Sequence, residues 1–422
     1  MRSLLEESFR AAVAAADPLA VLGPHLPPPP RGRTLVVGAG KAAASMAVAV
    51  ERGWPAGAPL EGIVLTRYQH ALPTSRIRVV EAGHPVPDEA GESGAREIFQ
   101  RASALTEDDL LIALLSGGGS SLLSLPAARI SMADLKAVTT QLLRCGAAIQ
   151  EINTVRKHLS AIQGGRLAAA CRAEVVALII SDVTGDDPTH IASGPCAPDP
   201  TTFRDALDVL ARYRVTPPRA VRARLEDGLA GRIAETPKPG DPVFARVENR
   251  VVATAHRSLE AAAATLRAAG VTPVILGDSV TGEASEVAKV LAAVVREVRR
   301  YGAPFAPPVA LISGGECTVT LRAEDGRGGR CSEFLLALAI ELEGISGVHA
   351  IAADTDGIDG SEDNAGALLG PDTATRARSA GIDPRDFLAR NDSYGFFAAL
   401  GDLLVTGPTL TNVNDYRAIV VA

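Results

Sequence analysis

The chain has 422 residues, and its 42 lysines and arginines against 49 aspartates and glutamates give a formal net charge of −7 at pH 7. At roughly 150 residues per domain, this length predicts two or three domains, and 47% hydrophobic residues are enough to bury sizeable cores. The acidic balance argues against a nucleic-acid partner, because phosphate contacts require clustered lysine and arginine side chains.

The N-terminal segment and the cysteines bear on where the protein acts. Residues 1–22 are predicted to form an amphipathic helix, because Glu6 and Glu7 interrupt the apolar stretch that a secretory signal would need. No apolar run approaches the ~18 residues that cross a bilayer. The five cysteines are scattered without a C-x-x-C pair, which suits reduced thiols. We therefore expect a cytoplasmic protein with no membrane partner.

From residue 34 onwards, short aliphatic runs alternate with helix-like segments. Continuous apolar runs are typical of strands buried on both faces, and their alternation with helices predicts a parallel sheet with helices on both sides. We therefore predict the α/β fold class. The predicted strands are residues 34–37, 62–66, 76–80, 110–115 and 175–181 in the first half, and 250–255, 272–276, 309–313, 349–353, 402–405 and 418–421 in the second.

A domain boundary is predicted at residues 236–242, where three prolines and a glycine in seven residues disfavour both helix and strand. The predicted domains are therefore residues 1–235 and 243–422. The alternative that the C-terminal strands return to the first domain stays open.

Four glycine-rich turns follow aliphatic runs, at residues 38–41, 116–121, 313–316 and 324–330. Ligands of open parallel sheets bind at the carboxyl ends of strands, where glycine lets the backbone approach an anion. The alternative is that these glycines only form tight turns. Because one Ser-Gly-Gly turn falls in each predicted domain, we expect two half-sites that face each other across a cleft.

The first turn allows two interpretations. Its glycines fit the dinucleotide pattern G-x-G-x-x-G/A, but that pattern also requires an acidic residue at the end of the second strand. Here this strand ends in Thr66 and Arg67, so NAD is disfavoured, whereas an arginine keeps NADP open. Lys41 within the turn instead indicates a phosphate or carboxylate ligand. The chain contains no Walker A pattern.

Two acidic loops follow predicted strands. In the first, Asp182, Asp186 and Asp187 are candidates for holding Mg²⁺, and in the second Asp354 and Asp356 repeat the arrangement. A solvated, self-capping turn is the alternative. The second loop resembles the start of an EF-hand but lacks its final glutamate, so we do not expect calcium.

Basic and amide side chains precede the first acidic loop. On a helix, Asn153, Arg156 and Lys157 share one face, which suits an anionic substrate, although an ordinary surface helix is the alternative. Arg327 and Arg330 lie among glycines, where a planar guanidinium is suited to a carboxylate or phosphoryl group. His84 and His190 lie in predicted loops and could act in acid–base chemistry, although a lone loop histidine is usually structural.

The motifs taken together resemble a known family, the class II glycerate kinases, whose C-terminal domain is named MOFRL. The resemblance runs from about residue 34 to the end of the chain. It departs from the family pattern at residues 413–417, and at Cys331 and Ser332, where relatives usually carry Asn-Gln. The matching segments are GAGKAAASMA, LLSGGGSSLL, INTVRKHLSAIQGGRLA, SDVTGDDPTHIASGPCAPDPTT, SGGECTVTL, GRGGRCSEFLLALA, DTDGIDGSEDNAGA and TGPTLTNVNDYRAIVV.

The resemblance implies a fold and an activity. It implies a Rossmann-like N-terminal domain, a second α/β domain and an active site in the cleft between them. The implied reaction transfers the γ-phosphoryl group of ATP to the 2-hydroxyl of D-glycerate with Mg²⁺, giving 2-phosphoglycerate and ADP. Some relatives are labelled hydroxypyruvate reductase, which keeps an NAD(P)H-dependent reductase as the alternative. A homodimer is left open.

The resemblance also implies roles for the candidate residues. Lys41 matches an important lysine of the family, and either Arg330 or Arg327 matches its important arginine. We expect Asp187 to accept the hydroxyl proton, Asn153, Arg156 and Lys157 to bind substrate, and Asp182, Asp186, Asp354 or Asp356 to hold the metal. The expected nucleotide-binding residues are Gly38, Gly40, Ser116, Gly117, Gly118, Gly119, Ser120, Ser121, Gly314 and Gly315.

Overall fold

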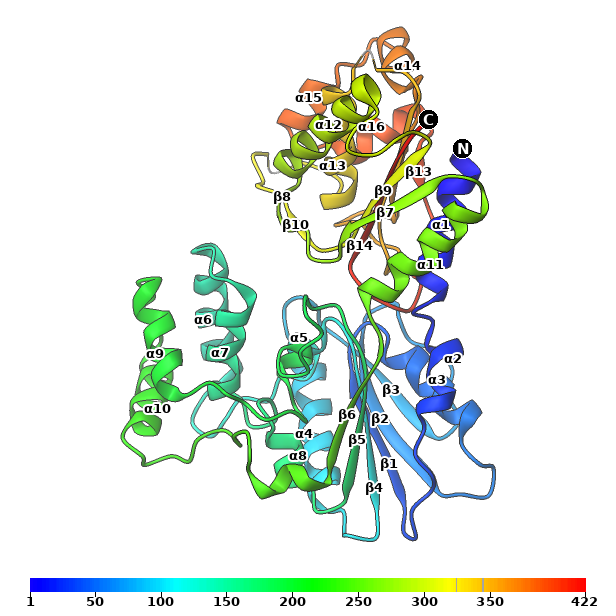
Figure 1. Cartoon of the computed structure of the whole chain (residues 1–422). Coiled ribbons are helices and arrows are strands. Elements are labelled where there is room, and N and C mark those ends of the chain that lie inside the picture. The colour runs from blue at the N-terminus through cyan, green and yellow to red at the C-terminus, as the bar shows by residue number, and fades with distance from the viewer. Residues whose placement is uncertain (324, 344) are drawn as a thin grey trace. The chain divides into compact units, whose positions relative to one another are not determined.

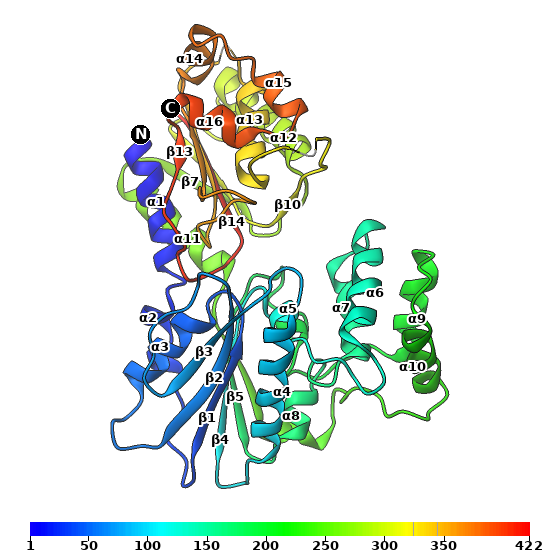
Figure 2. The same ribbon diagram turned by 180° about the vertical axis from the view of Figure 1, so that it is seen from behind.

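The computed structural model describes residues 1–323, 325–343 and 345–422, and the chain divides into two compact units. The first-sheet unit is Pro18–Val252, and the second-sheet unit joins Met1–Asp17 to Ala253–Ala422. Each unit contains its own sheet with helices on both faces (Figures 1 and 2). The α/β prediction is confirmed. Among the described residues, no helix combines the length and the apolar character needed to cross a membrane.

The first sheet has six strands in the order β3-β2-β1-β4-β5-β6. The pairs β3–β2, β2–β1, β1–β4 and β4–β5 are all parallel, as predicted. Every residue of β1 and β4 is buried, which explains their continuous apolar sequences. The strands are β1 Thr34–Ala39, β2 Leu60–Arg67, β3 Ile77–Ala82, β4 Leu110–Leu115, β5 Glu174–Ile180 and β6 Val247–Ala253.

Helices cover both faces of this sheet, with α3 on one face and α4 and α8 on the other (Figures 1 and 2). Four further helices, α6, α7, α9 and α10, form a separate group with its own apolar core. The helices are α2 Pro18–Val21, α3 Ala43–Gly53, α4 Glu89–Ser103, α5 Gly119–Leu122, α6 Met132–Arg144, α7 Ile149–Leu159, α8 Arg166–Ala170, α9 Phe203–Arg212 and α10 Arg219–Leu229, with 3₁₀ turns η1 Gly23–His25, η2 Ile191–Ser193 and η3 Pro242–Arg246.

The second sheet has the order β13-β12-β11-β14-β9-β7 and is mixed rather than parallel. Only β7 and β9 pair in parallel, and β14 runs antiparallel to both neighbours. The prediction of a parallel sheet was therefore wrong for this half, because loops rather than crossover helices join β11 to β12 and β13 to β14. Its strands are β7 Thr272–Gly277, β9 Val309–Ser313, β11 Val348–Asp354, β12 Gly366–Leu369, β13 Leu403–Leu404 and β14 Asp415–Val421, and the short strands β8 Gly282–Glu283 and β10 Cys317–Thr318 pair with each other.

One face of the second sheet packs on α12 and α13, and the other on α1 and α11 (Figure 1). Helix α13 begins at Arg330, the last residue of the fourth predicted glycine-rich turn. The helices of this unit are α1 Arg2–Ala14, α11 Ala255–Ala268, α12 Ala284–Tyr301, α13 Arg330–Glu341, α14 Thr373–Ser379, α15 Pro384–Ala389 and α16 Ser393–Leu400.

The compact units differ from the predicted domains 1–235 and 243–422 at two places. Helix α1 belongs with the C-terminal half, because Leu5 and Phe9 are buried in the core that contains Tyr416. The Ser8 and Tyr416 hydroxyls lie 2.8 Å apart. In addition, the predicted strand 250–255 falls on β6, which belongs to the first sheet. The boundary between the two compact units therefore follows the apolar cores, and it lies after the proline-rich segment at residues 236–242.

We expect Phe9→Ala to destabilise the second-sheet unit by about 3–5 kcal/mol, since the lost ring leaves a cavity in its core. Hydrogen exchange followed by mass spectrometry should show faster exchange in β14, whereas β4 in the same molecules should keep its protection. Leu19→Ala is the matched control, because Leu19 is 44% exposed. Equal loss of protection in β4 and β14 would contradict the assignment of α1.

Candidate functional site

The order of the first sheet reverses beside β1: the chain runs outward through β2 and β3 and then returns to β4 on the other side. Doubly wound sheets bind ligands at this point, outside the carboxyl ends of the strands. The turn of Gly38, Gly40 and Lys41 lies at the end of β1, and the turn that begins at Ser116 follows β4. The structure thus places the first two predicted turns side by side.

Hydrogen bonds join these two turns. The Lys41 backbone N–H donates to the Gly117 carbonyl at 2.8 Å, and the Ala42 N–H donates to the Ser116 hydroxyl at 3.1 Å. The turns can approach this closely because Gly40 has no side chain: it has φ +142°, and a Cβ there would overlap Ser116 Oγ. Glycine at position 40 is therefore required by the junction itself.

Gly118, at φ +81°, precedes the short helix α5. A Cβ on Gly118 would lie 2.9 Å from Nε2 of His84 and 3.5 Å from Cγ of Lys41, so these two side chains flank the turn. Within the described residues, the N–H groups of Gly117 and Gly118 have no hydrogen-bond acceptor. Backbone N–H groups in such a turn form a concave anion-binding surface.

A third segment adds polar side chains to this turn. The Ser193 hydroxyl lies 2.8 Å from Ser120 Oγ and 3.2 Å from Asn153 Oδ1, and Arg156 donates to the same Asn153 oxygen at 3.4 Å. Ala192 and Ser193 hold positive φ values of 50° and 59°, a strained arrangement that is common at functional sites. Asn153 and Arg156 thus share a hydrogen-bond chain with Ser120.

The other basic residues of α7 differ in their surroundings. Lys157 is fully buried, and its Nζ lies 3.3 Å from Asp199 Oδ1. The structure therefore gives Lys157 a buried ion pair, and its contact with substrate stays a prediction. Burial lowers the pKa of Arg156 to about 10, which keeps its guanidinium charged at neutral pH.

The first acidic loop lies at the carboxyl end of β5. Asp187 is exposed and accepts the Thr189 N–H at 2.8 Å. Partial burial alone would raise the pKa of Asp187, but the Thr189 hydrogen bonds and the nearby His190 and Lys157 lower it. Within residues 1–323, 325–343 and 345–422, no three His, Cys, Asp or Glu side chains gather as a metal site. Partly exposed Asp182 and Asp186 still fit Mg²⁺, which takes one or two carboxylates together with phosphate oxygens.

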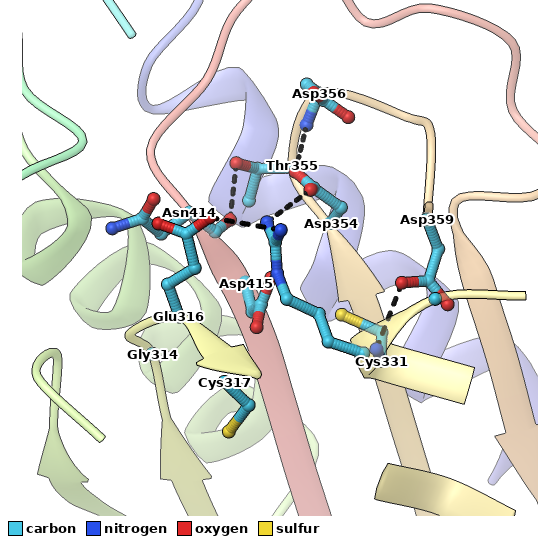
Figure 3. A network of polar contacts seen from close by, with 12 residues as sticks. Gly314, Glu316, Cys317, Cys331, Asp354, Thr355, Asp356, Asp359, Asn414 and Asp415 are labelled. Carbon is cyan, nitrogen blue, oxygen red and sulfur yellow. Dashed lines mark hydrogen bonds and ion pairs between the residues drawn. The ribbon is translucent and has the colours of Figure 1, made fainter. Parts of the chain in front are cut away.

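The second-sheet unit contains a separate charged cluster centred on Arg330, the first residue of α13. Figure 3 labels its three carboxylates, Glu316, Asp354 and Asp415. Its Nε lies 2.7 Å from Asp415, and its two terminal nitrogens lie 2.6 Å from Asp354 and 3.1 Å from Glu316. Burial alone would lower the pKa of Arg330, but these three carboxylates raise it well above its ordinary value. The guanidinium is therefore permanently charged and held in one orientation.

This cluster distinguishes the two candidate arginines. Arg327 is half exposed, 3.4 Å from Asp392 and stacked 5.3 Å over Tyr394, whereas Arg330 is fixed among buried carboxylates. Glu324, the first residue of the predicted fourth turn, lies outside the described residues.

Several groups of the neighbouring turn and of the second acidic loop already take part in hydrogen bonds or ion pairs. The Gly314 N–H donates to Gly277, and the Gly315 carbonyl accepts the Asp415 N–H. Asp354 uses one oxygen for Arg330 and the other for the Asp356 N–H. Nucleotide binding by Gly314 and Gly315 and metal binding by Asp354 and Asp356 therefore stay predictions, and the observed contacts serve to fix Arg330.

Asp359 holds the N-terminus of α13, which carries Arg330. Its two oxygens accept the N–H groups of Cys331 at 3.0 Å and Ser332 at 2.8 Å. Cys331 and Ser332, the two residues that depart from the family pattern here, thus have fully buried side chains. The Asp359 carboxylate caps the helix at their backbone N–H groups. Sequence reasoning missed Asp359, Asp415 and Ser193, although the first two lie within acidic or strand-start motifs.

Comparisons with known proteins place the chain among glycerate kinases. Residues 4–226 match the profile of a domain of unknown function, DUF4147, and residues 309–415 match the MOFRL family. A Pyrococcus horikoshii protein named glycerate 2-kinase is 40% identical, over 93% of this chain and 88% of the relative. A crystal structure of glycerate kinase from Thermotoga maritima matches with a TM-score of 0.87 at 37% identity, covering 100% of this chain and 99% of that chain.

Another relative carries a different name. A protein from Agrobacterium vitis, named provisionally as a hydroxypyruvate reductase, is 54% identical over 100% of this chain and 94% of the relative. Both names therefore occur among similar proteins, as the resemblance implied.

We expect Gly40→Ala to destabilise the first-sheet unit by about 2–4 kcal/mol, since the new Cβ meets Ser116 in a backbone region that alanine avoids. Gly57→Ala is the matched control, because nothing lies within 4 Å of a Cβ there. Urea unfolding of both variants measures the difference. Equal urea midpoints for Gly40→Ala and Gly57→Ala would show that the contact between the two turns does not require glycine at position 40.

Proposed function

Because the chain belongs to the glycerate kinase family that carries a MOFRL domain, we propose that it transfers the γ-phosphoryl group of ATP to the 2-hydroxyl of D-glycerate. The products are 2-phosphoglycerate and ADP. The observation that supports this most directly is the junction of the turns after β1 and β4, where Lys41 accompanies two backbone N–H groups without an acceptor among the described residues.

In this proposal, the turn from Ser116 to Ser121 and the turn of Gly38 and Gly40 bind the ATP phosphates. Backbone N–H groups would donate to phosphate oxygens, and the Lys41 ammonium would neutralise part of their charge. Phosphoryl transfer depends on such positioning and charge neutralisation more than on covalent chemistry.

For the acceptor, we propose that Asn153 and Arg156 bind the glycerate, since both are joined by hydrogen bonds to the turn at Ser120. Asp187 would accept the proton of the 2-hydroxyl, because its carboxylate is exposed in the loop that follows β5. Arg330, rather than Arg327, would stabilise the charge on the transferring group. Active-site placement in a cleft between the domains stays a prediction.

Mg²⁺ would neutralise phosphate charge when bound. Asp182 and Asp186 are the residues that we propose to hold it, because both are partly exposed at the end of β5. Asp354 lies 2.6 Å from Arg330, and its binding of metal stays a prediction.

The alternative activity, NAD(P)H-dependent reduction of hydroxypyruvate, is favoured by the names of two similar Agrobacterium vitis proteins. Against an NADH-dependent reductase, β2 ends in Thr66 and Arg67, without the acid that would bind a ribose hydroxyl, whereas Arg67 leaves NADPH open. A single assay decides between the two. A kinase releases ADP only with D-glycerate and Mg²⁺, whereas a reductase consumes NAD(P)H with hydroxypyruvate and leaves ATP intact.

The product identifies the hydroxyl that is phosphorylated. Proton-coupled phosphorus NMR of the product should show a doublet, because C2 carries one hydrogen. A triplet would indicate transfer to the 3-hydroxyl, whose carbon carries two, and would overturn the proposed regiochemistry while leaving the kinase assignment intact.

We expect Lys41→Met to lower kcat by about 100-fold or more with the fold intact, since the variant removes the charge and keeps the length of the side chain. Steady-state ADP release measures the change. Lys289→Met is the control, because Lys289 is exposed on α12. Near-normal turnover of Lys41→Met would remove Lys41 from the chemistry.

A further inference from the structure

We propose that Arg417 and Asp415 are positioning residues that fix the Arg330 guanidinium for phosphoryl transfer. This inference rests on the proposed function of Arg330. It assigns a role to two residues of β14, which lie outside the glycine-rich turns, and therefore to the last motif of the chain.

Asp415 connects two guanidinium groups through different oxygens. Its Oδ1 lies 2.7 Å from Nε of Arg330, and its Oδ2 lies 2.5 Å from a terminal nitrogen of Arg417. The Asp415 side chain is fully buried, and the Arg417 side chain is 1% exposed. A carboxylate shared in this way cannot rotate without breaking one of two charge-assisted hydrogen bonds.

Arg417 fastens this carboxylate to the neighbouring turn. It donates to the Gly314 carbonyl at 2.9 Å, approaches Cys317 Sγ at 3.2 Å and lies 5.5 Å over the ring of Phe334 in α13. In the antiparallel pairing of β14 with β9, Arg417 faces Ser313, the last residue of β9. Arg417 therefore ties together the turn after β9, the start of β14 and the helix that carries Arg330.

The three carboxylates around Arg330 are not equivalent. The Asp354 and Asp415 side chains are 3% and 0% exposed, whereas the Glu316 side chain is 54% exposed. The two buried acids hold Nε and one terminal nitrogen, so the remaining nitrogen faces the exposed partner. An anionic group can displace an exposed carboxylate at low cost. The orientation set by Asp415 and Arg417 thus decides which nitrogen of Arg330 is presented.

A merely structural role for Arg417 predicts something different. Loss of Arg417 removes one cationic partner of the buried Asp415 carboxylate, so it lowers stability. If stability were the whole role, loss of Arg417 would lower activity only through the folded fraction. If Arg417 acts through Arg330, replacement of Arg417 lowers kcat very little in a protein whose Arg330 has already been replaced.

The test is a double-mutant cycle on the full chain with Arg417→Met and Arg330→Lys. We expect Arg417→Met to lower kcat about 30-fold with the KM for ATP and D-glycerate changed less than about threefold, and to have almost no further effect in the Arg330→Lys background. Additive effects on kcat, or an unchanged kcat for folded Arg417→Met, would overturn the proposal.

Two further variants keep the test decisive. Should Arg417→Met fail to fold, Arg417→Lys and Asp415→Asn replace it in the cycle, since each keeps part of the hydrogen bonding. Arg376→Met is the matched control: Arg376 pairs with buried Asp402 in the same unit, outside this cluster, so its loss should lower the melting temperature without changing kcat.

A measurement independent of turnover separates this inference from the proposed function. In protein labelled with ¹⁵N-arginine, the Arg330 Nε–H should exchange slowly with water and exchange at least tenfold faster in Arg417→Met. An unchanged rate would overturn the positioning role. Absence of ADP release by the wild-type chain would instead refute the kinase activity, and the exchange rate would then decide the positioning role alone.

Discussion

The close approach of two backbone turns is the constraint on which the candidate site of the first-sheet unit depends. The turns after β1 and β4 share hydrogen bonds from Lys41 and Ala42, and they can do so only because Gly40 leaves room for Ser116. This contact fixes the direction in which the turn from Gly117 onward presents its N–H groups. A chain of side-chain hydrogen bonds that begins at Ser120 in the same turn connects it to Asn153 and Arg156.

The second-sheet unit solves a different problem, which is to hold a partly buried cation in a fixed position. Arg330 is stabilised there by Asp354 and Asp415, and Arg417 completes the cluster with a second guanidinium. Both cations, partly buried Arg330 and buried Arg417, pair with buried Asp415, and Arg330 pairs also with buried Asp354, so neither cation is left unpaired. The cluster is therefore rigid, and it lies where β11, β14 and α13 begin or end.

Much of this organisation could be predicted from the sequence, because it is local. Continuous apolar runs gave the strands of the first sheet, and glycines marked the turns at their ends. The antiparallel course of β14 and the return of α1 to the C-terminal half could not be predicted, since they depend on long-range packing such as Phe9 beside Tyr416. Ser193 was missed for a related reason: its left-handed backbone is imposed by surrounding contacts and leaves no pattern in the sequence.

The two Ser-Gly-Gly turns look equivalent in the sequence, but their hydrogen bonds show that they are not. After β4, the N–H groups of Gly117 and Gly118 have no acceptor among the described residues. After β9, the Gly314 N–H is used, and the two glycine carbonyls accept from Arg417 and Asp415. The two turns therefore differ in which backbone groups are engaged: the carbonyls of the second turn accept from Arg417 and Asp415, next to Arg330. In the proposed reaction, the backbone donors hold the phosphates and a fixed charge stabilises the group that moves.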